Sequence, residues 1–385
     1  MRIYFTLKQF IPKVFIALFF LSACTSSKQQ FEKGNYEKAV ALSIKKLRKK
    51  PDNSKQKNIL MAAYQYAVQV SEEKIKQHQQ STDRFKWDRV IEQYQQMQQL
   101  YTDLLQCPAC LSVVKPLNLQ NELNQALAKG AQVYVEEGKK ALGTKNKEGG
   151  RLAFRRFAQA KAYQNNYNNI DLLLNDARIQ GTEIIGISRI PVSSKGLELN
   201  TAFFLQQLTQ ALNDLNYFFA VFIPIEQLAA QKQVPDQVVD LSFDDYYIGQ
   251  TYVKEVRESL VRDSVKVGEV TDSLGTKYAV YGDVKADLQR FEKTIESGGL
   301  LNIAIVEPNS KSILFQQKIP STTLWQNNWA TYQGDKRALT KEELALTQEK
   351  ELLPPPPQDL FYSFTQPLFD QTANLLRRRY RYLKQ

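Results

Sequence analysis

Apolar residues recur every three or four positions between residues 31 and 181, the spacing that places them on one face of an α-helix. Residues 57–79 and 85–105 show this spacing most clearly. In the second stretch the expected inward-facing residues are Trp87, Val90, Ile91, Tyr94, Met97, Tyr101, Leu104 and Leu105. The pattern predicts an all-α N-terminal domain over residues 31–181.

A different pattern begins at Thr182, where runs of β-branched and aromatic residues replace the helical spacing. A helix is expected over 200–215, and strands are expected over 183–190, 217–223, 238–243, 250–266, 276–293, 300–306 and 313–319. Because the strands after residue 238 follow one another directly, they predict an antiparallel meander flanked by helices. Residues 182–353 are therefore expected to form a mixed, mainly antiparallel α+β domain, and α+β is the fold class predicted for the chain.

The C-terminal residues 354–385 are expected to form a linker and a helix. Four consecutive prolines, from Pro354 to Pro357, predict a semi-rigid linker before a helix over 358–382. The end of that helix carries four cations: Arg377, Arg378, Arg379 and Arg381. Cations suit a helix C-terminus through the helix dipole alone. The alternative is contact with an anionic surface such as lipid headgroups or a wall polymer.

The N-terminal residues have the pattern of an export signal. Three cations, at Arg2, Lys8 and Lys13, precede an apolar run over residues 14–21 that is too short to span a membrane. The sequence Leu21-Ser22-Ala23-Cys24 then resembles the bacterial lipobox. This resemblance implies that residues 1–23 are a removable lipoprotein signal peptide and that Cys24 carries a diacylglycerol and an N-terminal acyl chain such as palmitate. An ordinary signal peptide that ends beside a cysteine is the alternative.

Residues 24–30 are expected to be a short polar tether between the lipid and the first helix. In the sorting rule for such lipoproteins, an Asp directly after the modified cysteine retains the protein at the inner membrane, and Thr25 stands there instead. The resemblance therefore implies a lipid-anchored outer-membrane protein. Because residues 25–30 contain no acidic side chain of the kind that directs surface export, we expect the chain to face the periplasm.

The net charge of the chain is positive. Its 385 residues include 51 Lys and Arg against 40 Asp and Glu, a formal net charge of +11. Removing residues 1–23 takes away three cations and no anion, so 51 − 3 leaves 48 basic against 40 acidic side chains, or +8. Because an exported protein does not meet nucleic acid, no nucleic-acid partner is expected. The excess charge either faces an anionic envelope polymer or is simply solvated.

Two stretches of the helical region resemble tetratricopeptide repeats. The first begins at Gly34 and ends at Pro51, and it departs from the family pattern at Ser43 and Lys46. The second places its aromatic, small and turn residues at Tyr134, Gly138, an expected Gly149-Gly150 turn, Ala153, Phe157 and Ala160. The resemblance implies a scaffold that binds a protein partner rather than a catalyst.

Cys107 and Cys110 form a CxxC motif, which in an oxidising compartment predicts either a local disulfide or a thiol-redox pair. A redox pair needs its first cysteine at the start of a helix in a βαβ unit, whereas this motif follows a long helix. A metal site would need two further ligands, and His78 is the only histidine. A disulfide is the favoured interpretation, and no metal or cofactor is expected.

A candidate ligand-binding site groups two of the three tryptophans with polar and charged side chains: Trp325, Trp329, Tyr332, Asp335 and Arg337. Aromatic rings beside carboxylate and guanidinium groups suit a sugar or a peptide. The alternative is that the tryptophans cover the sheet and that Gly334-Asp335 forms a turn.

The long strand expected over 250–266 carries charges on both faces, with Glu255 and Arg257 on one and Lys254 and Glu258 on the other. A lipid-facing strand would be continuously apolar on one face. We therefore expect a solvated β-arm whose edge is a candidate partner-binding surface.

The segment from Trp325 to Leu339, the proline run and residues 361–367 resemble a family of Bacteroidetes-type outer-membrane lipoproteins with tetratricopeptide-like repeats. The order of strand, helix and strand also resembles, at the level of fold, periplasmic domains of lipoproteins that activate cell-wall synthases or build secretion channels. The sequence contains no phosphate loop, zinc spacing or nucleophile elbow. We expect a non-enzymatic, lipid-anchored scaffold or binding protein in envelope assembly or transport. A carbohydrate-active or thiol-redox envelope enzyme is the alternative.

Overall fold

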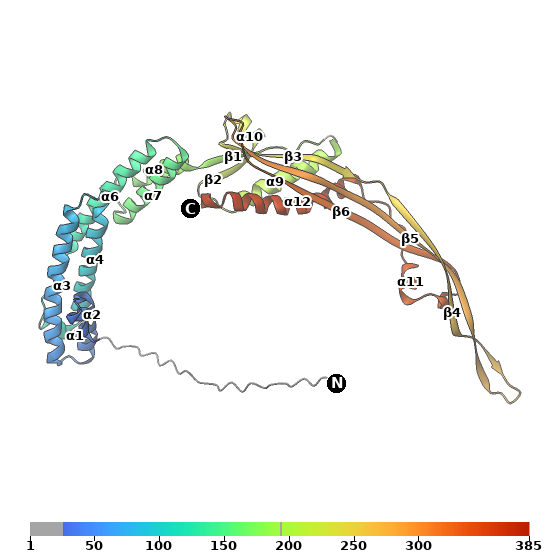
Figure 1. Cartoon of the computed structure of the whole chain (residues 1–385), viewed down its shortest axis with the longest axis horizontal. Helices are drawn as coiled ribbons and strands as arrows, with labels where there is room; N and C mark the ends of the chain where they lie inside the picture. The colour runs from blue at the N-terminus through green and yellow to red at the C-terminus, as the bar shows by residue number, and fades with distance from the viewer. Residues whose placement is uncertain (1–25, 193–194, 385) are drawn as a thin grey trace, which may run out of the picture. The chain divides into compact units, whose positions relative to one another are not determined.

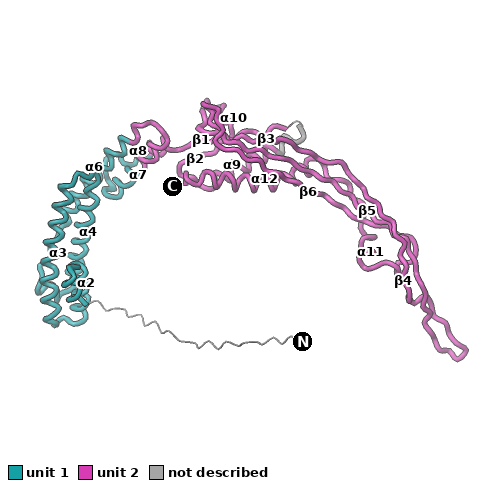
Figure 2. Tube along the Cα trace, viewed as in Figure 1, with its two compact units in different colours: residues 1–140, 155–174 teal, residues 141–154, 175–385 magenta. Residues whose placement is uncertain are grey.

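The computed structural model describes residues 26–192 and 195–384, and the chain divides into two compact units (Figure 1; Figure 2). One unit consists of residues 1–140 and 155–174, and the other of residues 141–154 and 175–385. The expected domain boundary at residue 181 thus falls inside the second unit. Cys24 and the predicted signal peptide lie outside the described residues. Within the described ranges, no helix combines the length and the apolar composition that crossing a membrane requires.

The first unit is built from helices. They are α1 (Ser27–Glu32), α2 (Tyr36–Lys49), α3 (Ser54–Gln80), α4 (Lys86–Leu105), α5 (Pro108–Leu111), α6 (Gln120–Leu142) as far as residue 140, α7 (Lys147–Tyr163) from residue 155, and α8 (Ile170–Gly181) as far as residue 174. The helices predicted over 57–79 and 85–105 are confirmed as α3 and α4. Leu47, Leu60 and Leu104 are fully buried where α2, α3 and α4 pack together.

The turn expected at Gly149-Gly150 is wrong, because both glycines lie at the start of α7. The side chain of Asn146 accepts a hydrogen bond from the Gly149 N–H at 2.7 Å, so the helix begins before the glycines. A Cβ added at Gly150 would lie 2.4 Å from the backbone nitrogen of Gly181. Glycine is needed here for the close approach of two backbones and not for a turn.

The second unit contains a six-stranded mixed sheet. Its strands are β1 (Glu183–Ile187), β2 (Ala220–Pro224), β3 (Gln237–Ile248), β4 (Tyr252–Thr271), β5 (Lys277–Val306) and β6 (Ile313–Gly334). β1 pairs in parallel with β2 and β3, whereas β5 pairs in antiparallel with β3, β4 and β6. The α+β class is therefore confirmed.

The strand order differs from a simple meander, because β3 and β4 follow one another in the chain but do not pair. Both lie along the same edge of β5, β3 beside residues 297–306 and β4 beside residues 277–294. β5 is one strand of 30 residues, where the sequence predicted two. A Cβ added at Gly299 would lie 3.0 Å from the Tyr246 side chain and 3.1 Å from that of Phe364. The glycines that suggested a break instead admit close packing beside a continuous strand.

Helices α9 (Lys195–Asn213) and α12 (Pro357–Arg379) cover one face of the sheet (Figure 1). The core between these helices and the sheet includes Ile185, Phe222, Ile303, Phe361 and Phe364, each at most 1% exposed. The C-terminal helix therefore belongs to this core. It begins at the last of the four linker prolines, because proline is well tolerated in the first turn of a helix. The short α10 (Ile225–Ala230) follows β2, and η2 (Arg381–Lys384) follows α12.

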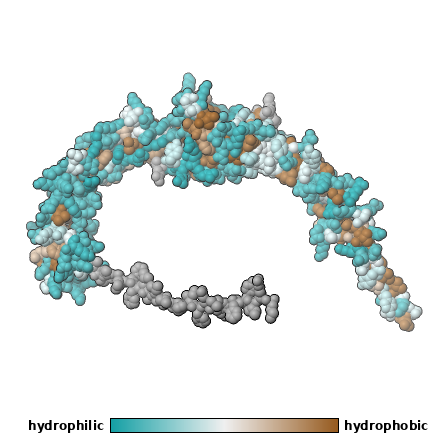
Figure 3. All heavy atoms as spheres, viewed as in Figure 1, coloured by the Kyte–Doolittle hydropathy of each residue, from teal (hydrophilic) through white to brown (hydrophobic). Residues whose placement is uncertain are grey.

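The distal part of the sheet is three-stranded and then two-stranded. We call β4, residues 277–295 of β5 and residues 325–334 of β6 the arm. Beyond Ala286, which pairs with Gly334, only β4 and β5 continue. After β6 the chain forms η1 (Lys336–Ala338) and α11 (Lys341–Leu346), which pack against the arm around Leu288, Ala330 and Leu339. Apolar side chains are exposed at the end of the arm (Figure 3), and Leu274 in its turn is 90% exposed.

Candidate functional site

The five residues of the predicted ligand-binding site lie on β6 and on the turn that follows it, and the structure does not bring them together. Trp325 and Trp329 point to one face of the arm, opposite Ile295 and Phe291 of β5. Tyr332, three positions after Trp329 on the same strand, points to the other face. The three rings therefore do not form a single aromatic platform.

The ring of Trp329 is already engaged within the chain. It stacks on Phe291 with ring centroids 5.0 Å apart and an angle of 8° between the planes. The Nζ of Lys293 lies 5.4 Å from the centroid of the Trp329 ring. Trp325 and Trp329 are both only partly exposed. This arrangement favours the interpretation that the tryptophans cover the sheet.

A short segment covers the same face of the arm beside Trp329. Lys293, 5% exposed, forms an ion pair with Glu351 and donates a hydrogen bond to the Leu352 carbonyl oxygen at 3.1 Å. The side-chain oxygen of Asn327 accepts a hydrogen bond from the Leu352 N–H at 2.9 Å. We call residues 350–352 the strap. The strap leads into the proline linker and so fixes the start of that linker on the arm.

Asp335 and Arg337 bond to each other and to β4. The Asp335 carboxylate lies 2.5 Å from the Arg337 guanidinium, and it also accepts the Arg337 N–H at 2.9 Å. These hydrogen bonds lower the pKa of Asp335 to about 2. The guanidinium donates to the Lys266 carbonyl oxygen at 2.6 Å, and Arg262 donates to the Arg337 carbonyl oxygen at 3.0 Å. The pair therefore joins the end of β6 to β4 at the β4 bulges, which is a structural role.

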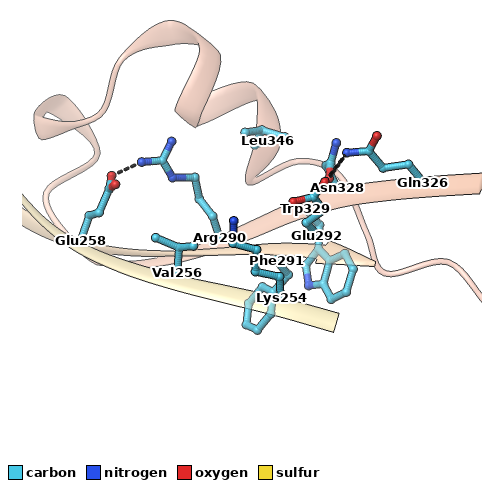
Figure 4. Close-up of a pocket in the computed structure, with 10 residues that line it drawn as sticks. All are labelled: Lys254, Val256, Glu258, Arg290, Phe291, Glu292, Gln326, Asn328, Trp329 and Leu346. Carbon is cyan, nitrogen blue, oxygen red and sulfur yellow. Dashed lines mark hydrogen bonds and ion pairs between the residues drawn. The ribbon is translucent and has the colours of Figure 1, made fainter. Parts of the chain in front are cut away.

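A cavity of about 370 Å³ lies on the other face of the arm, below Leu346 of α11 (Figure 4). Most of its polar side chains pair with one another. Arg290 forms an ion pair with Glu258, and Gln326 donates to Glu292 at 2.8 Å. Because these groups already satisfy each other, a ligand entering the cavity would have to break existing bonds. Apart from Lys254, which forms no ion pair among the described residues, the charged side chains of the cavity are therefore occupied by one another or by Gln326.

Cys107 and Cys110 form a disulfide, and their exposed fractions are 1% and 0%. They pack beside Leu104 and Val114 in the core of the helical unit. A thiol-exchange reaction requires access to a sulfur atom, so this position favours a structural role. Among the residues that the structure describes, no group of three or more His, Cys, Asp or Glu side chains could hold a metal ion.

The predicted anionic-surface residues are all exposed, three at the end of α12 and one at the start of η2: Arg377, Arg378, Arg379 and Arg381. The guanidinium of Arg379 lies 6.0 Å from the centroid of the Phe315 ring, and Arg377 donates to the Asn374 side chain at 3.3 Å. Neither contact neutralises a charge. The exposed charges agree with both interpretations given above, stabilisation by the helix dipole and contact with an anionic surface.

The helical unit contains another cavity, with a volume of about 280 Å³ and a wall that is mainly apolar. Its wall is formed by residues of α3 and α4 and of the segment that precedes α6: Val68, Ser71, Ile75, Tyr94, Met97, Leu117 and Leu119. Ser71 is 2% exposed, and its hydroxyl has no hydrogen-bond partner among the described residues. A buried hydroxyl without a partner is unusual in a folded protein. The charged and amide side chains Glu72, Lys76, Gln79 and Glu122 form the rim.

The side of this cavity formed by residues 117–119 is held in place by the two long helices. The Leu117 N–H donates to the Tyr64 hydroxyl at 2.8 Å, and the Leu119 N–H donates to the Gln98 side chain at 3.1 Å. Burial raises the pKa of Tyr94, and the nearby negative charge of Glu122 raises it further. Tyr94 is therefore a neutral hydrogen-bonding group at neutral pH. The cavity is therefore present in the isolated chain.

Sequence reasoning placed Tyr94 and Met97 on the inward stripe of a helix but did not identify the cavity. The segment with Leu117 and Leu119 has no helical spacing that would have assigned it to the same surface. The feature of the sequence that could have indicated the cavity is Ser71. This polar residue lies on the buried face of α3, four positions after Ala67 and four before Ile75, both of which are buried.

The comparisons with known proteins add little to this geometry. A scan against protein-family models gives no match, and a search of the curated proteins gives none. Among solved structures the chain is similar to a neuraminyllactose-binding hemagglutinin homolog from Helicobacter pylori. The similarity has a TM-score of 0.23 at 12% sequence identity, and it covers 51% of this chain and 84% of that one. At this level it carries no argument about fold, ligand or partner.

Proposed function

We propose that the chain is a lipid-anchored protein of the bacterial outer membrane that binds a protein partner through its helical unit and catalyses no reaction. The observation that carries the partner-binding part of this proposal is the cavity around Ser71. Pockets for small ligands usually have volumes of ~300–1,000 Å³, so a cavity of about 280 Å³ is small for a metabolite. It is suited to one apolar side chain that projects from a protein surface.

The composition of the cavity agrees with this occupant. Strong protein-binding sites place a buried anchor residue at the centre and a polar rim around it. Here Ile75 and Met97 are at most 7% exposed in the wall, whereas Glu72, Lys76 and Glu122 are charged groups at the mouth.

The tetratricopeptide-like pattern supports the same function. Stacked helix pairs present surfaces that bind protein segments, and the residues that carried the resemblance, Phe157 and Ala160 among them, are fully buried in the helical unit. We propose that these helices are degenerate repeats of that kind. The pathway served would be envelope assembly or transport, with the partner on the periplasmic side.

The anchor is tested separately from the partner. Cells grown with an alkyne fatty acid should label the wild-type protein, and Cys24→Ser should abolish the label and release the protein from the membrane fraction. Protease added to intact cells should leave the wild-type protein uncut, because the periplasm is enclosed. Labelling of the Cys24→Ser protein would contradict lipidation at that residue.

The partner is tested with a photo-crosslinking amino acid at Leu117, 42% exposed at the cavity, and at Leu105, 48% exposed at the end of α4, as the control. We expect one envelope protein to be captured at position 117 and not at position 105. Filling the cavity with Ser71→Leu should abolish the capture, whereas Ser71→Ala should preserve it. Capture that is equal at both positions, or that survives Ser71→Leu in a chain with native circular dichroism, would contradict the proposal.

A further inference from the structure

One edge of β4 is open. This strand pairs on one side only, with β5, and residues 252–262 have no backbone partner on the other side within the described ranges. β4 has 20 residues and no proline, and its bulges lie beyond Arg262. Proteins usually block long regular edges, because their unpaired N–H and C=O groups recruit another strand. The half of β4 that begins at Tyr252 has neither a proline nor a bulge, and its protection consists of charged side chains such as Lys254.

The residues along this edge are complementary to themselves. In an antiparallel pair whose two-fold axis passes through Val256, each residue faces the one equally far on the other side of Val256. Lys254 then faces Glu258 of the second copy, and Glu255 faces Arg257. Val256 faces its own counterpart. Because of the two-fold symmetry, each of these two charge pairs occurs twice in the dimer. In every pair the two facing charges are opposite in sign.

The neighbouring registers of the same strand are unfavourable. Facing residues must lie on the same face of the sheet, so the axis must pass through a residue and not between two residues. An axis through Glu255 would place that carboxylate against its own counterpart. An axis through Arg257 would do the same with two guanidinium groups. Like charges directly opposite each other destabilise a strand pair, so the charges favour the axis at Val256.

Some of the charges near this axis already form ion pairs within one chain. Glu255 lies 2.6 Å from Arg257, and Glu258 forms an ion pair with Arg290. Lys254 forms no ion pair among the described residues. A second copy would extend the pair of Glu255 and Arg257 into a cluster of four alternating charges, and it would supply Lys254 with a counter-charge.

The apolar side chains around the axis are exposed in the isolated chain. Tyr252 is 70% exposed, Val253 53% and Val256 37%. Pairing would cover part of this surface, and it would place Tyr252 opposite Leu260 of the second copy. The edge therefore offers a second copy both apolar contact and charge complementarity.

We infer that the protein forms a two-fold symmetric homodimer by antiparallel pairing of β4 with β4 of a second copy, centred on Val256. Pairing joins the two sheets into one continuous sheet. Because Lys254, Val256 and Glu258 also line the cavity in Figure 4, the second copy would extend the wall of that cavity. The interface is small, so the dimer is reversible in solution. Confinement to a membrane surface, which rests on the proposed lipid anchor, would favour it.

A cysteine scan tests the axis. Cys107 and Cys110 are bonded to each other and buried, so a single cysteine can be added to the full-length chain in isolated envelopes, with the wild-type chain as the background. Val256→Cys should give a covalent dimer on mild oxidation, because facing Cα atoms lie within disulfide range.

The matched control for the scan is Val261→Cys, 58% exposed on the same strand. The two copies of position 261 would lie about 33 Å apart along the paired strands, so this variant should give at least about tenfold less dimer. Equal cross-linking at both positions, or no cross-linking at position 256, would overturn the inference.

A charge exchange tests the register without a cross-link. Glu255→Arg should weaken dimerisation about tenfold in analytical ultracentrifugation of the full chain in detergent, because it places two cations opposite each other. Adding Arg257→Glu to the same chain should restore the dimer. The doubly exchanged chain should not pair with the wild-type chain, since each exchanged side chain would then face a side chain of the same charge. A dimer unaffected by Glu255→Arg, or a purely monomeric wild-type protein at high concentration, would overturn the inference.

Discussion

The carboxylate of Asp88, at the start of α4, accepts a hydrogen bond from the hydroxyl of Tyr134 on α6 at 2.7 Å. Its other oxygen accepts the hydroxyl of Tyr163, on α7, at the same distance of 2.7 Å. One carboxylate thus joins three helices of the first unit. The Arg156 guanidinium lies 5.7 Å from the centroid of the Tyr134 ring and 4.5 Å from that of Phe85. This polar cluster is a specific feature of the packing that hydrophobic burial alone does not provide.

The Asp88 cluster predicts a loss of stability at alkaline pH. Burial, together with the hydrogen bond to Asp88 and its charge, raises the pKa of Tyr134 to about 12, against 10.0 in the unfolded chain. The native state then holds the tyrosine proton more tightly than the unfolded state, so the stabilisation is complete below pH 10 and is lost as the pH rises towards 12. The free energy of unfolding, measured by urea denaturation, should fall in this window.

The control for this prediction separates Tyr134 from other tyrosines. Tyr134→Phe should be less stable than wild type below this window but should lose less stability across it. Tyr66→Phe, at a tyrosine 46% exposed in the same unit, should follow the wild-type curve. Replacing Trp325 and Trp329 by Phe in all chains leaves Trp87 as the only tryptophan, so its fluorescence reports on the helical unit. Parallel curves for Tyr134→Phe and wild type would contradict the prediction.

A buried ion pair in the second unit predicts that a single substitution lowers the free energy of unfolding much more than the matching double substitution does. The guanidinium of Arg151 lies 2.6 Å from the Glu183 carboxylate, with side-chain exposures of 17% and 10%. Gln237 donates to the other oxygen of Glu183 at 2.9 Å and accepts the Tyr380 hydroxyl at 3.0 Å. Arg151→Met leaves the carboxylate buried without its cation and should cost ~3–5 kcal/mol of unfolding free energy.

Adding Glu183→Gln to Arg151→Met removes the unpaired charge and should recover most of that loss. A double-mutant cycle measured by urea denaturation gives the coupling energy directly. If the double substitution is as destabilising as the sum of the single ones, the ion pair does not contribute to stability in the way that its burial suggests.

Particular residues show how much of this structure could be read from the sequence. The helices were predictable because Val90, Ile91, Met97 and Leu104 follow the helical period, and tertiary packing agrees with that period. The strand that begins β6 was expected to end at residue 319, directly before Pro320, a residue that is rare inside sheets. Pro320 is tolerated because β6 is an edge strand that pairs only with β5, where a missing N–H can face away from the ladder.

The candidate sites were less predictable, because they depend on the true length of β6 and on contacts between residues far apart in the sequence. Once β6 is known to run through Gly334, alternation alone separates Trp329 from Tyr332. The cavity at Ser71 depends on residues 117–119, which are positioned by hydrogen bonds to Tyr64 and Gln98 and not by any periodic pattern. A site built from such long-range contacts is not visible in local spacing.

The disulfide predicts a change in stability without a change in binding. Closing the short loop from Cys107 to Cys110 should contribute about 2 kcal/mol by reducing the entropy of the unfolded chain. Cys107→Ser with Cys110→Ser should lower the urea midpoint accordingly. Capture of a partner at position 117 should persist at temperatures where the variant is folded. Loss of capture in a folded variant would indicate exchange chemistry at these cysteines and would revive the thiol-redox alternative.

The strap predicts local and not global effects. Asn327 and Lys293 hold residues 350–352 on the arm through the Leu352 backbone, and Lys293 also pairs with Glu351. Asn327→Ala removes the acceptor of the Leu352 N–H, so hydrogen exchange in peptides covering 347–356 should become at least about tenfold faster, as expected for the loss of ~1.4 kcal/mol of local stability.

Asn328→Ala, on the opposite face of the same strand, is the matched control and should leave this exchange unchanged. The urea midpoint should shift little in both variants, because α12 is held by its own core contacts at Phe361 and Phe364. Faster exchange throughout α12 in Asn327→Ala would instead show that the strap and the C-terminal helix unfold as one unit.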